Sequence, residues 1–456
     1  MNKKIFGITV LIILLFVCNS FAQNPVIQTS YTADPAPMVH NGTVYLYTSH
    51  DEDITVKNFF TMNDWRCYST KDMVNWTDHG SILSYKAFSW SRGDAWAGQC
   101  IFRNGKFYYY LPVNQKNGGN AIGVATSDSP TGNFKDGIGA PLLSGFGFID
   151  PSVFIDEDGQ AYLYWGNPDL YYVKLNDDML SYDKEIGVVK VPLTKEGFSI
   201  RIKDAVKRPS AYEEGPWLFK RNNKYYLLYP AGGVPEHLAY STSDGPTGPW
   251  TYGNVIMEVI KERGAFTNHP GYIDFLGKSY LFYHNGGLKG GGGFKRSVCI
   301  EPFTFNPDGS IPLILPTKNG VTQSVVNLDP FQRVEAETIA WAEGVKTDRD
   351  SLSGQVFVTQ TNENDYIKIR SVDFQHGAEQ FEARVKALVS DANIEVRIDS
   401  IEGPILGKLK VGSNRKTQKW KTKKCKLIKT KGIHDLYLIF KGEKGDLMNF
   451  DWWIIK

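Results

Sequence analysis

Carboxylate, imidazole and indole side chains recur at matched positions of this sequence. Each of five segments ends in residues typical of a tight turn, and a run of aromatic residues follows the turn. Near the start of each segment, eight or nine residues before the turn, stand in order Asp34, Trp96, Asp150, Glu214 and His269. Acidic residues are costly to bury at apolar strand starts, and carboxylates that share a small space acquire separated pKa values. If the segments converge, the sequence predicts a centre for acid–base chemistry. Asp-Pro and Glu-Gly-Pro are also ordinary turn formers, so one such residue alone would indicate little.

The spacing of the turns indicates how these residues would be brought together. The turn positions 42, 105, 159, 223 and 277 are 63, 54, 64 and 54 residues apart. Asn-Gly and Asp-Gly between apolar runs favour two-residue hairpins, because both turn positions need positive φ. Five similar all-β units of this length predict a five-bladed β-propeller over residues 25–325, whose inner strands line one central channel. A two-sheet sandwich is the alternative, but it does not account for the period.

The chain changes character after residue 325. From 331 to 456 it consists of short segments in which apolar and polar residues alternate, such as 365–370, 393–398 and 435–440. Period-2 alternation with one apolar face predicts a β-sandwich of the jelly-roll kind. The expected fold is therefore all-β, a propeller followed by a sandwich.

Composition and the N-terminus bound the class of protein. The 456 residues carry a net charge of +2 and 13% aromatic residues, which argues against the whole chain being a nucleic-acid binder. Residues 1–22 read as a signal peptide with cleavage after Ala22, which predicts a secreted or periplasmic protein without membrane association beyond export. A lipid anchor at Cys18, giving a cell-surface lipoprotein, is the alternative. The spacing of the other four cysteines predicts no disulfide framework.

Three motifs carry a resemblance to a known family. Ala33-Asp34-Pro35, Phe148-Ile-Asp150-Pro-Ser-Val and Tyr212-Glu-Glu214-Gly-Pro-Trp217 resemble the motifs of glycoside hydrolase family 43. That family has a five-bladed propeller and includes inverting arabinofuranosidases, xylosidases and arabinanases without an organic cofactor. The resemblance implies Asp34 as general base, Glu214 as general acid, and Asp150 as the residue that raises the pKa of the acid and orients it. Glu213 is the neighbour that competes with Glu214 for the acid's position.

These residue types suit inverting hydrolysis. One ionised carboxylate activates water and one protonated carboxyl protonates the leaving oxygen, about 6.5–9.5 Å away. A third carboxylate beside the acid disfavours its ionised form. The same likeness implies Trp96 as a stacking wall for the sugar and Arg296 as a donor to its hydroxyls. His269 is expected either to bind a central metal ion or hold a water, or to be a satisfied histidine of the channel.

The C-terminal region resembles carbohydrate-binding module family 6 at 334–337, 394–400, 432–438 and 449–452. Glu335, Glu337 and Asp451 would then be oxygen ligands for the structural calcium of such modules. The family's usual pair of stacking residues is replaced by Gln360 and Thr417, so either a sugar-binding or a purely structural role stays open. Residues 408–431 carry eleven Lys or Arg and no Asp or Glu. This run is either a solvated face or a surface for acidic glycans.

Together these features predict an exported, inverting glycoside hydrolase, an α-L-arabinofuranosidase that removes side chains from arabinoxylan or a related plant cell-wall polysaccharide. The stretch Asp94-Ala-Trp-Ala-Gly-Gln99 and the appended module favour this activity. β-Xylosidase is the alternative within the class. A catalytically silent glycan-binding protein is the alternative outside it, although such a protein would have no need of three carboxylates.

Overall fold

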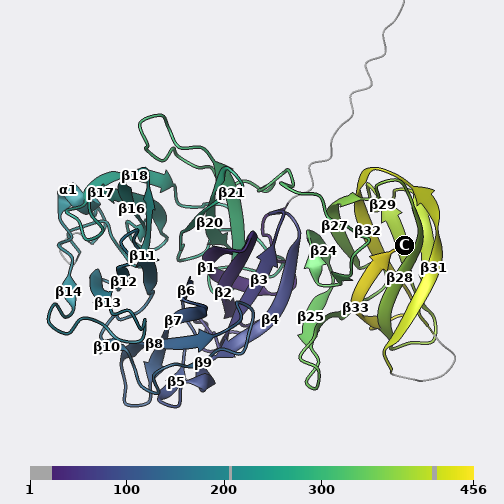
Figure 1. The fold of residues 1–456 in the computed structure, drawn as a ribbon, viewed down its shortest axis with the longest axis horizontal. Coiled ribbons are helices and arrows are strands. Elements are labelled where there is room, and N and C mark those ends of the chain that lie inside the picture. Colours follow the sequence, from purple (N-terminus) through teal and green to yellow (C-terminus); the bar gives the residue numbers. More distant parts are fainter. Residues whose placement is uncertain (1–22, 205–207, 413–418) are drawn as a thin grey trace, which may run out of the picture.

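The computed structural model describes residues 23–204, 208–412 and 419–456. It consists of two all-β lobes, a larger one formed by the N-terminal two thirds of the chain and a smaller one formed by the remainder (Figure 1). The expected signal peptide, including Cys18, lies outside the described residues. No helix in the described ranges is long and apolar enough to cross a bilayer.

The larger lobe is a five-bladed propeller, as the repeat predicts. Its blades are five antiparallel sheets. Blade 1 consists of β1 (Tyr31–His40), β2 (Thr43–Asp51), β3 (Asp64–Thr70) and β4 (Trp76–Ser84), and blade 2 of β5 (Ser91–Gly93), β6 (Gln99–Arg103), β7 (Lys106–Gln115), β8 (Asn120–Ser127), β9 (Lys135–Asp136) and β10 (Leu143–Gly145). Blade 3 consists of β11 (Ser152–Ile155), β12 (Ala161–Trp165), β13 (Tyr171–Leu175) and β14 (Val189–Lys190), and blade 4 of β15 (Trp217–Arg221), β16 (Lys224–Ala231), β17 (His237–Ser243) and β18 (Thr251–Met257). Blade 5 consists of β19 (Gly271–Phe275), β20 (Lys278–Asn285) and β21 (Ser297–Phe303). A 3₁₀ turn (Tyr85–Ala87) and the one-turn helix α1 (Lys195–Phe198) lie in the loops.

The inner strand of each blade follows the chain order around the channel. β1, β6, β11, β15 and β19 each contact the next, and β19 contacts β1. The N-terminal segment closes the ring, because Val26 N donates to Val298 O at 2.9 Å and Thr32 N to Arg296 O at 2.9 Å, alongside β21. The expected hairpins form with positive φ at the turns, for example 47° at Asn41 and 69° at Gly42. Each inner strand therefore starts at the same end of the channel.

The smaller lobe is a two-sheet sandwich. One sheet has the order β25-β26-β33-β28-β31 with β22 beside β33, and the other has the order β24-β27-β32-β29-β30. Their bounds are β22 (Val334–Glu335), β24 (Trp341–Glu343), β25 (Lys346–Arg349), β26 (Val356–Thr359), β27 (Tyr366–Asp373), β28 (Ala378–Ala387), β29 (Ala392–Ile398), β30 (Ile405–Lys410), β31 (Lys421–Thr430), β32 (Ile433–Gly442) and β33 (Met448–Ile455). Alternate residues point into its core, as Phe381, Ala383 and Val385 do in β28.

The two lobes are joined by more than the linker. Strand β23 (Thr338–Ile339) lies within the region expected to be sandwich, yet it pairs with β4 and so becomes the outermost strand of blade 1. Arg370 of the sandwich donates its backbone N–H to Asn75 Oδ1 at 2.8 Å and its guanidinium to Thr322 O at 2.5 Å. The sandwich therefore caps an edge of the propeller that would otherwise present unpaired backbone groups.

Candidate functional site

The expected catalytic residues meet at one end of the propeller channel. Asp34, Asp150, Glu214 and His269 are all buried and line a single cavity of about 220 Å³. Asp34 and Asp150 have φ of 53° and 57°, in the left-handed region, immediately before a proline. Such a conformation costs a non-glycine residue free energy and is retained where the surrounding structure imposes it. In both blades it turns the carboxylate out of the strand and toward the channel.

The cavity wall is completed by apolar side chains and a few polar ones. Besides the four residues above, the lining consists of Phe59, Phe60, Met62, Trp96, Ala97, Ile149, Asn167, Thr267 and Arg296. All three residues predicted to bind substrate, Trp96, His269 and Arg296, are therefore in the wall. Their roles as substrate ligands stay a prediction, and the contacts of Arg296 point to a different function.

Asp34 is held as an ionised carboxylate. Arg296 Nη1 donates to its Oδ1 at 2.8 Å, and His269 Nδ1 lies 3.6 Å from the same oxygen. Burial by itself raises the pKa of Asp34, but the charges of Arg296 and His269 outweigh burial and lower the pKa to about 2. A carboxylate that stays ionised at every working pH suits the general base of a hydrolase.

Arg296 is committed to protein partners. Its Nε and Nη2 donate to the two oxygens of Asp51 at 2.9 Å each, and its Nη1 also donates to Thr267 Oγ1 at 3.1 Å. Its side chain is 3% exposed. In this structure Arg296 fixes Asp34 and favours its ionised form, Asp51 holds Arg296 in place, and the expected donation to sugar hydroxyls stays a prediction.

Glu214 faces His269 across from Asp34. His269 Nε2 lies 3.2 Å from Glu214 Oε1, so the imidazole stands between the two carboxylates, with one on each ring nitrogen. Asn167 Nδ2 donates to the other oxygen of Glu214. Asp34 and Glu214 are therefore held apart by one imidazole ring with a carboxylate at each nitrogen.

Glu213 is excluded from the acid's position by its own partners. Arg201 and Arg208 both form ion pairs with it. Arg208 Nη2 also donates to Asn167 Oδ1 at 3.0 Å, and Asn167 contacts Glu214. The two adjacent glutamates therefore have different roles. Glu213 anchors the loop, and through Arg208 and Asn167 it orients Glu214.

The pKa values of Asp150 and Glu214 shift in opposite directions. Candidate ligand atoms of Asp150, Glu214 and His269 all lie within 4.8 Å of one another. Burial, opposed by His269 but reinforced by the charges of Glu214 and Asp34, raises the pKa of Asp150 to about 8. Burial also acts on Glu214, but the contacts from His269 and Asn167 prevail and lower its pKa. The pKa of Glu214 is thus shifted in the direction opposite to the expected one, because hydrogen-bond donors surround Glu214 and few reach Asp150.

Two histidines of the site differ in charge. Burial lowers the pKa of His269, but Asp34 and Glu214 on its two nitrogens raise it to about 10, so the ring is an imidazolium. His284 is its opposite. Burial and the neighbouring charge of Arg296 keep its pKa well below the usual value, and its Nδ1 accepts the backbone N–H of Asp34 at 3.1 Å.

Sequence reasoning did not identify His284, Asn167, Asp51 or Glu236 as parts of this site. Glu236 is a fourth carboxyl near the centre. It is 5% exposed, accepts the N–H of Asn268 at 2.9 Å, and has a pKa raised well above its usual value by burial and by Glu214. None of these residues occupies the matched position before a turn, so the repeat carries no signal for them. A search for polar residues in the apolar second strands and the loops that follow them would have found Asp51, His284 and Glu236.

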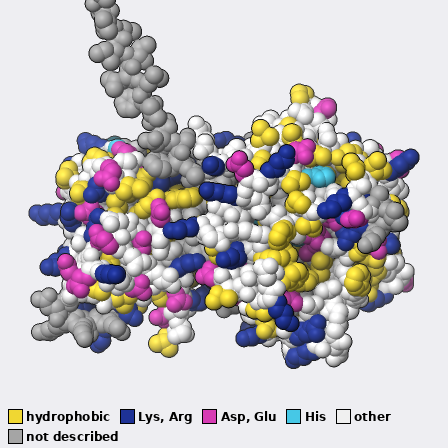
Figure 2. Space-filling model, turned by 180° about the vertical axis from the view of Figure 1, so that it is seen from behind, with side chains coloured by type: hydrophobic (Ala, Val, Ile, Leu, Met, Phe, Trp, Pro, Cys, Tyr) yellow, Lys and Arg dark blue, Asp and Glu magenta, His cyan; other side chains and the backbone are white. Residues whose placement is uncertain are grey.

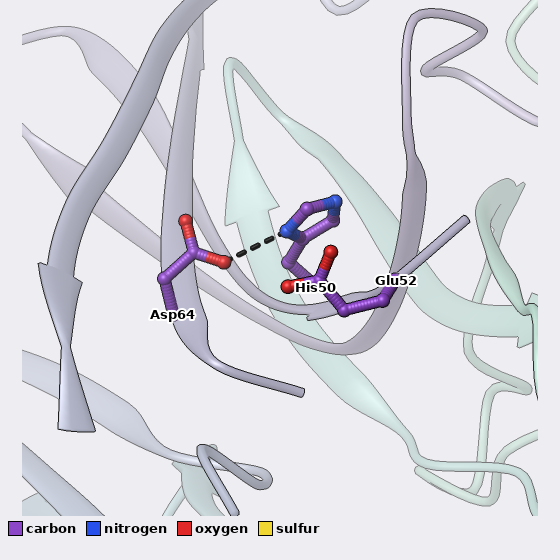
Figure 3. Close-up of side chains that lie close together, drawn as sticks. All are labelled: His50, Glu52 and Asp64. Carbon is purple, nitrogen blue, oxygen red and sulfur yellow. Dashed lines mark hydrogen bonds and ion pairs between the residues drawn. The ribbon is translucent and has the colours of Figure 1, made fainter. Parts of the chain in front are cut away.

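Two compact groups of described side chains could hold a metal ion, and the three predicted calcium ligands do not form a third such group. Asp150, Glu214 and His269 form one compact group, and His50, Glu52 and Asp64 form another at the ends of β2 and β3, where His50 Nδ1 and Asp64 Oδ1 are 2.7 Å apart (Figure 3). The predicted calcium ligands lie at the interface of the lobes. Glu335 pairs with Arg333, whereas Glu337 Oε2 and Asp451 Oδ1 are buried without a hydrogen-bond partner.

The other two features singled out in the smaller lobe lie on its surface. The basic run maps to β30 and β31, and the lysines of β31 are largely exposed, while Thr417 lies outside the described residues. Gln360 is exposed after β26. On the face drawn in Figure 2, Lys and Arg side chains are interspersed with Asp and Glu over both lobes.

Comparisons with known proteins agree with this geometry. The family described as "Glycosyl hydrolases family 43" matches residues 22–311, and "Carbohydrate binding module (family 6)" matches residues 335–456. The chain therefore belongs to glycosyl hydrolase family 43, carries a C-terminal family 6 module, and is a glycoside hydrolase rather than a silent glycan-binding protein.

Relatives extend the similarity over both lobes. The chain is 33% identical to an arabinoxylan arabinofuranohydrolase of Bacillus subtilis over 99% of this chain and 95% of that protein, and 33% identical to one of Paenibacillus polymyxa over 94% and 74%. A crystal structure of a family 43 arabinoxylan arabinofuranohydrolase from Bacillus subtilis, in complex with cellotetraose, has a TM-score of 0.81 and 30% identity. It covers 95% of this chain and 97% of that one.

Proposed function

We propose that this protein removes α-L-arabinofuranosyl side chains from arabinoxylan, with inversion at the anomeric carbon. The observation that carries the proposal is the small cavity in which Asp34 and Glu214 lie on opposite nitrogens of His269. Pockets for drug-sized ligands are about 300–1,000 Å³, so a cavity of about 220 Å³ suits one terminal sugar better than a chain. Similarity to arabinoxylan arabinofuranohydrolases through both lobes supports the choice of polymer.

In this mechanism Asp34 accepts a proton from the attacking water while the glycosidic oxygen takes a proton from Glu214. Arg296 keeps Asp34 ionised and fixed, and the imidazolium of His269 holds the two carboxylates apart. Asp150, whose pKa is raised to about 8, is the proposed source of the proton that Glu214 delivers. Trp96 supplies an apolar wall against the sugar face.

Rates on 4-nitrophenyl α-L-arabinofuranoside and on 4-nitrophenyl β-D-xylopyranoside test the proposal, together with release of arabinose from arabinoxylan. We expect the arabinofuranoside to be the better substrate and arabinose to be the product. Relatives named xylosidase/arabinosidase cover about 63% of this chain, so the converse preference would identify a β-xylosidase and overturn the substrate proposed here.

The proposal also includes a calcium ion bound in the smaller lobe. Glu337 Oε2 and Asp451 Oδ1, which accept no hydrogen bond, and Glu335 close by are the hard oxygen ligands that Ca²⁺ takes, although Arg333 and Arg384 form ion pairs with Asp451. The ion would connect the turn that leads into β23 with strand β33. It would also remove the cost of burying these carboxylates. The residues around His269 fit a directly bound ion poorly, because both ring nitrogens face carboxylates.

Two further parts of the proposal concern the ends of the chain. Residues 1–22 direct export, and cleavage after Ala22 gives a secreted or periplasmic enzyme, which N-terminal sequencing of the mature protein tests. The family 6 module binds plant cell-wall glycan and holds the propeller close to its substrate. Retention of the isolated Asp34→Asn protein on insoluble arabinoxylan measures that binding without hydrolysis.

A further inference from the structure

A second and larger cavity lies between the two lobes. It measures about 830 Å³, against about 220 Å³ for the catalytic cavity. The propeller contributes the N-terminal segment up to Tyr31, Arg263, the glycine-rich loop 286–291 and Lys318. The sandwich contributes β24, residues 344–346 and Asp365. We call it the interlobe cleft.

Cations predominate over anions in the lining of this cleft. Arg263, Lys289, Lys318 and Lys346 face two acids, Glu343 and Asp365. Lys346 is paired with Asp53 at 3.3 Å, and the Asp365 carboxylate accepts the backbone N–H of Asn362 at 2.7 Å. Among the described residues, no carboxylate lies within ion-pair distance of Arg263, Lys289 or Lys318. Three cations therefore remain available to an anionic ligand.

The cleft also offers an apolar surface and exposed backbone. Trp341 is partly exposed and stands on the sandwich side, packed against Tyr366 and Tyr437. Across from it, the loop 286–291 contains four glycines, so little side-chain bulk covers its main chain. Gly290 has φ of 77°, and a Cβ there would lie 2.7 Å from Tyr31 Oη, so the loop approaches Tyr31 closely only as glycine. An indole face beside ammonium and guanidinium groups suits a sugar ring that bears a carboxylate.

The cleft adjoins the catalytic cavity through two short segments. On β1, Tyr31 lines the cleft and Asp34 lines the cavity, and on the loop before β21, Gly291 lines the cleft while Arg296 lines the cavity. Lys295, between them, places Nζ 5.3 Å from the centre of the Tyr31 ring. The two cavities therefore share these two segments as walls.

We propose that the interlobe cleft binds a uronic acid substituent of the glycan, by ion pairs from Lys289, Lys318 and Arg263 and stacking on Trp341. The proposal rests on the proposed function only in taking plant cell-wall glycan as the ligand, and its binding test needs no catalysis. It also differs from the basic run on β30 and β31, which presents lysines on an open sheet edge without a cleft.

Calorimetric titration of the full chain tests this site. The probe is a xylo-oligosaccharide that carries one glucuronate, and its matched control is the same oligosaccharide with the carboxylate reduced to an alcohol. We expect the acidic probe to bind about tenfold more tightly at low salt, the combined effect of a few exposed ion pairs. Equal affinity for the two oligosaccharides would overturn the proposal.

Charge-matched variants locate the binding. Lys289→Gln/Lys318→Gln should abolish most of the preference for the acidic probe, and Arg263→Gln should reduce it by itself. Lys424→Gln/Lys426→Gln removes the same charge from β31 and should leave the preference intact. Loss of the preference only in the β31 variant would assign acidic binding to the basic run instead. All these side chains are exposed, and an unchanged rate on 4-nitrophenyl arabinofuranoside verifies that each variant is folded. If wild-type protein had no activity on 4-nitrophenyl arabinofuranoside, the proposed function would be contradicted, but the binding result would still hold.

Discussion

Replacing Asp150 by Asn tests where the catalytic proton is stored. Asp150 is protonated in the free structure up to a pH of about 8, so Asn is close to it in shape and charge. Asn also tolerates the positive φ of this position. With Asp150 gone, the proton must be held by Glu214, whose pKa is lowered from its ordinary value of 4.5 by His269 and Asn167. The basic limb of the pH–rate profile should therefore move from about 8 to lower pH.

The size of the effect depends on how far the basic limb moves. For each pH unit by which it moves below 7, turnover on arabinoxylo-oligosaccharides at pH 7 should fall about tenfold, because His269 and Asn167 lower the pKa of Glu214. At pH 5 the same variant should lose less, because a larger fraction of Glu214 is protonated there. Aryl arabinofuranosides, whose leaving group needs little protonation, should show a much smaller loss at both values.

Stability provides a second readout of the same proton. In the wild type, the unfolded chain releases the Asp150 proton near pH 4 and the folded chain near pH 8, so stability falls as the pH rises through this window. Asp150→Asn removes that loss, and its melting temperature should exceed that of the wild type at pH 7 by more than at pH 4. Asp158→Asn, at the exposed turn of the same blade, is the control and should change neither property. A basic limb that stays near 8 together with a lowered melting temperature would refute the stored proton and leave Asp150 as a turn residue.

Other parts of the site lead to separate expectations. Asp34→Asn should abolish turnover on every substrate, since it removes the base, and measurable rates on the polymer would contradict that role. Glu214→Gln should slow arabinoxylan hydrolysis far more than hydrolysis of aryl glycosides, and an equal loss on both would show that Glu214 does not protonate the leaving group. Proton NMR in the first minutes of reaction should show a product of inverted anomeric configuration, whereas retention would imply a covalent intermediate. Removal of calcium by a chelator should lower the melting temperature of the wild type but not that of Glu337→Gln, in which one of the proposed ligands is lost, and an equal fall in both would place the ion elsewhere.

The fold was within reach of the sequence because its determinants are local and repeated. An Asn-Gly or Asp-Gly pair favours a two-residue hairpin turn. Three such pairs, with Asn222-Asn223 and Leu276-Gly277 at the two other matched positions, leave few architectures other than a propeller. The positions of Asp34, Asp150 and Glu214 followed from the same regularity. Equivalent residues of a radial repeat converge on its axis, so their proximity needs no knowledge of side-chain contacts.

What the tertiary structure decided is the state of each group at that axis. Asp51 lies on the second strand of blade 1 and Arg296 at the start of the last strand of blade 5, and only closure of the ring brings Asp51 onto the guanidinium that fixes Asp34. The acid's pKa depends likewise on Asn167, 47 residues before Glu214, and on His269, 55 residues after it. The interlobe cleft and the pairing of β23 with β4 arise where the two lobes meet. Spacing along the chain determines which residues share a channel, but protonation and ion pairing depend on distances of a few ångströms between remote segments, which only the packed chain defines.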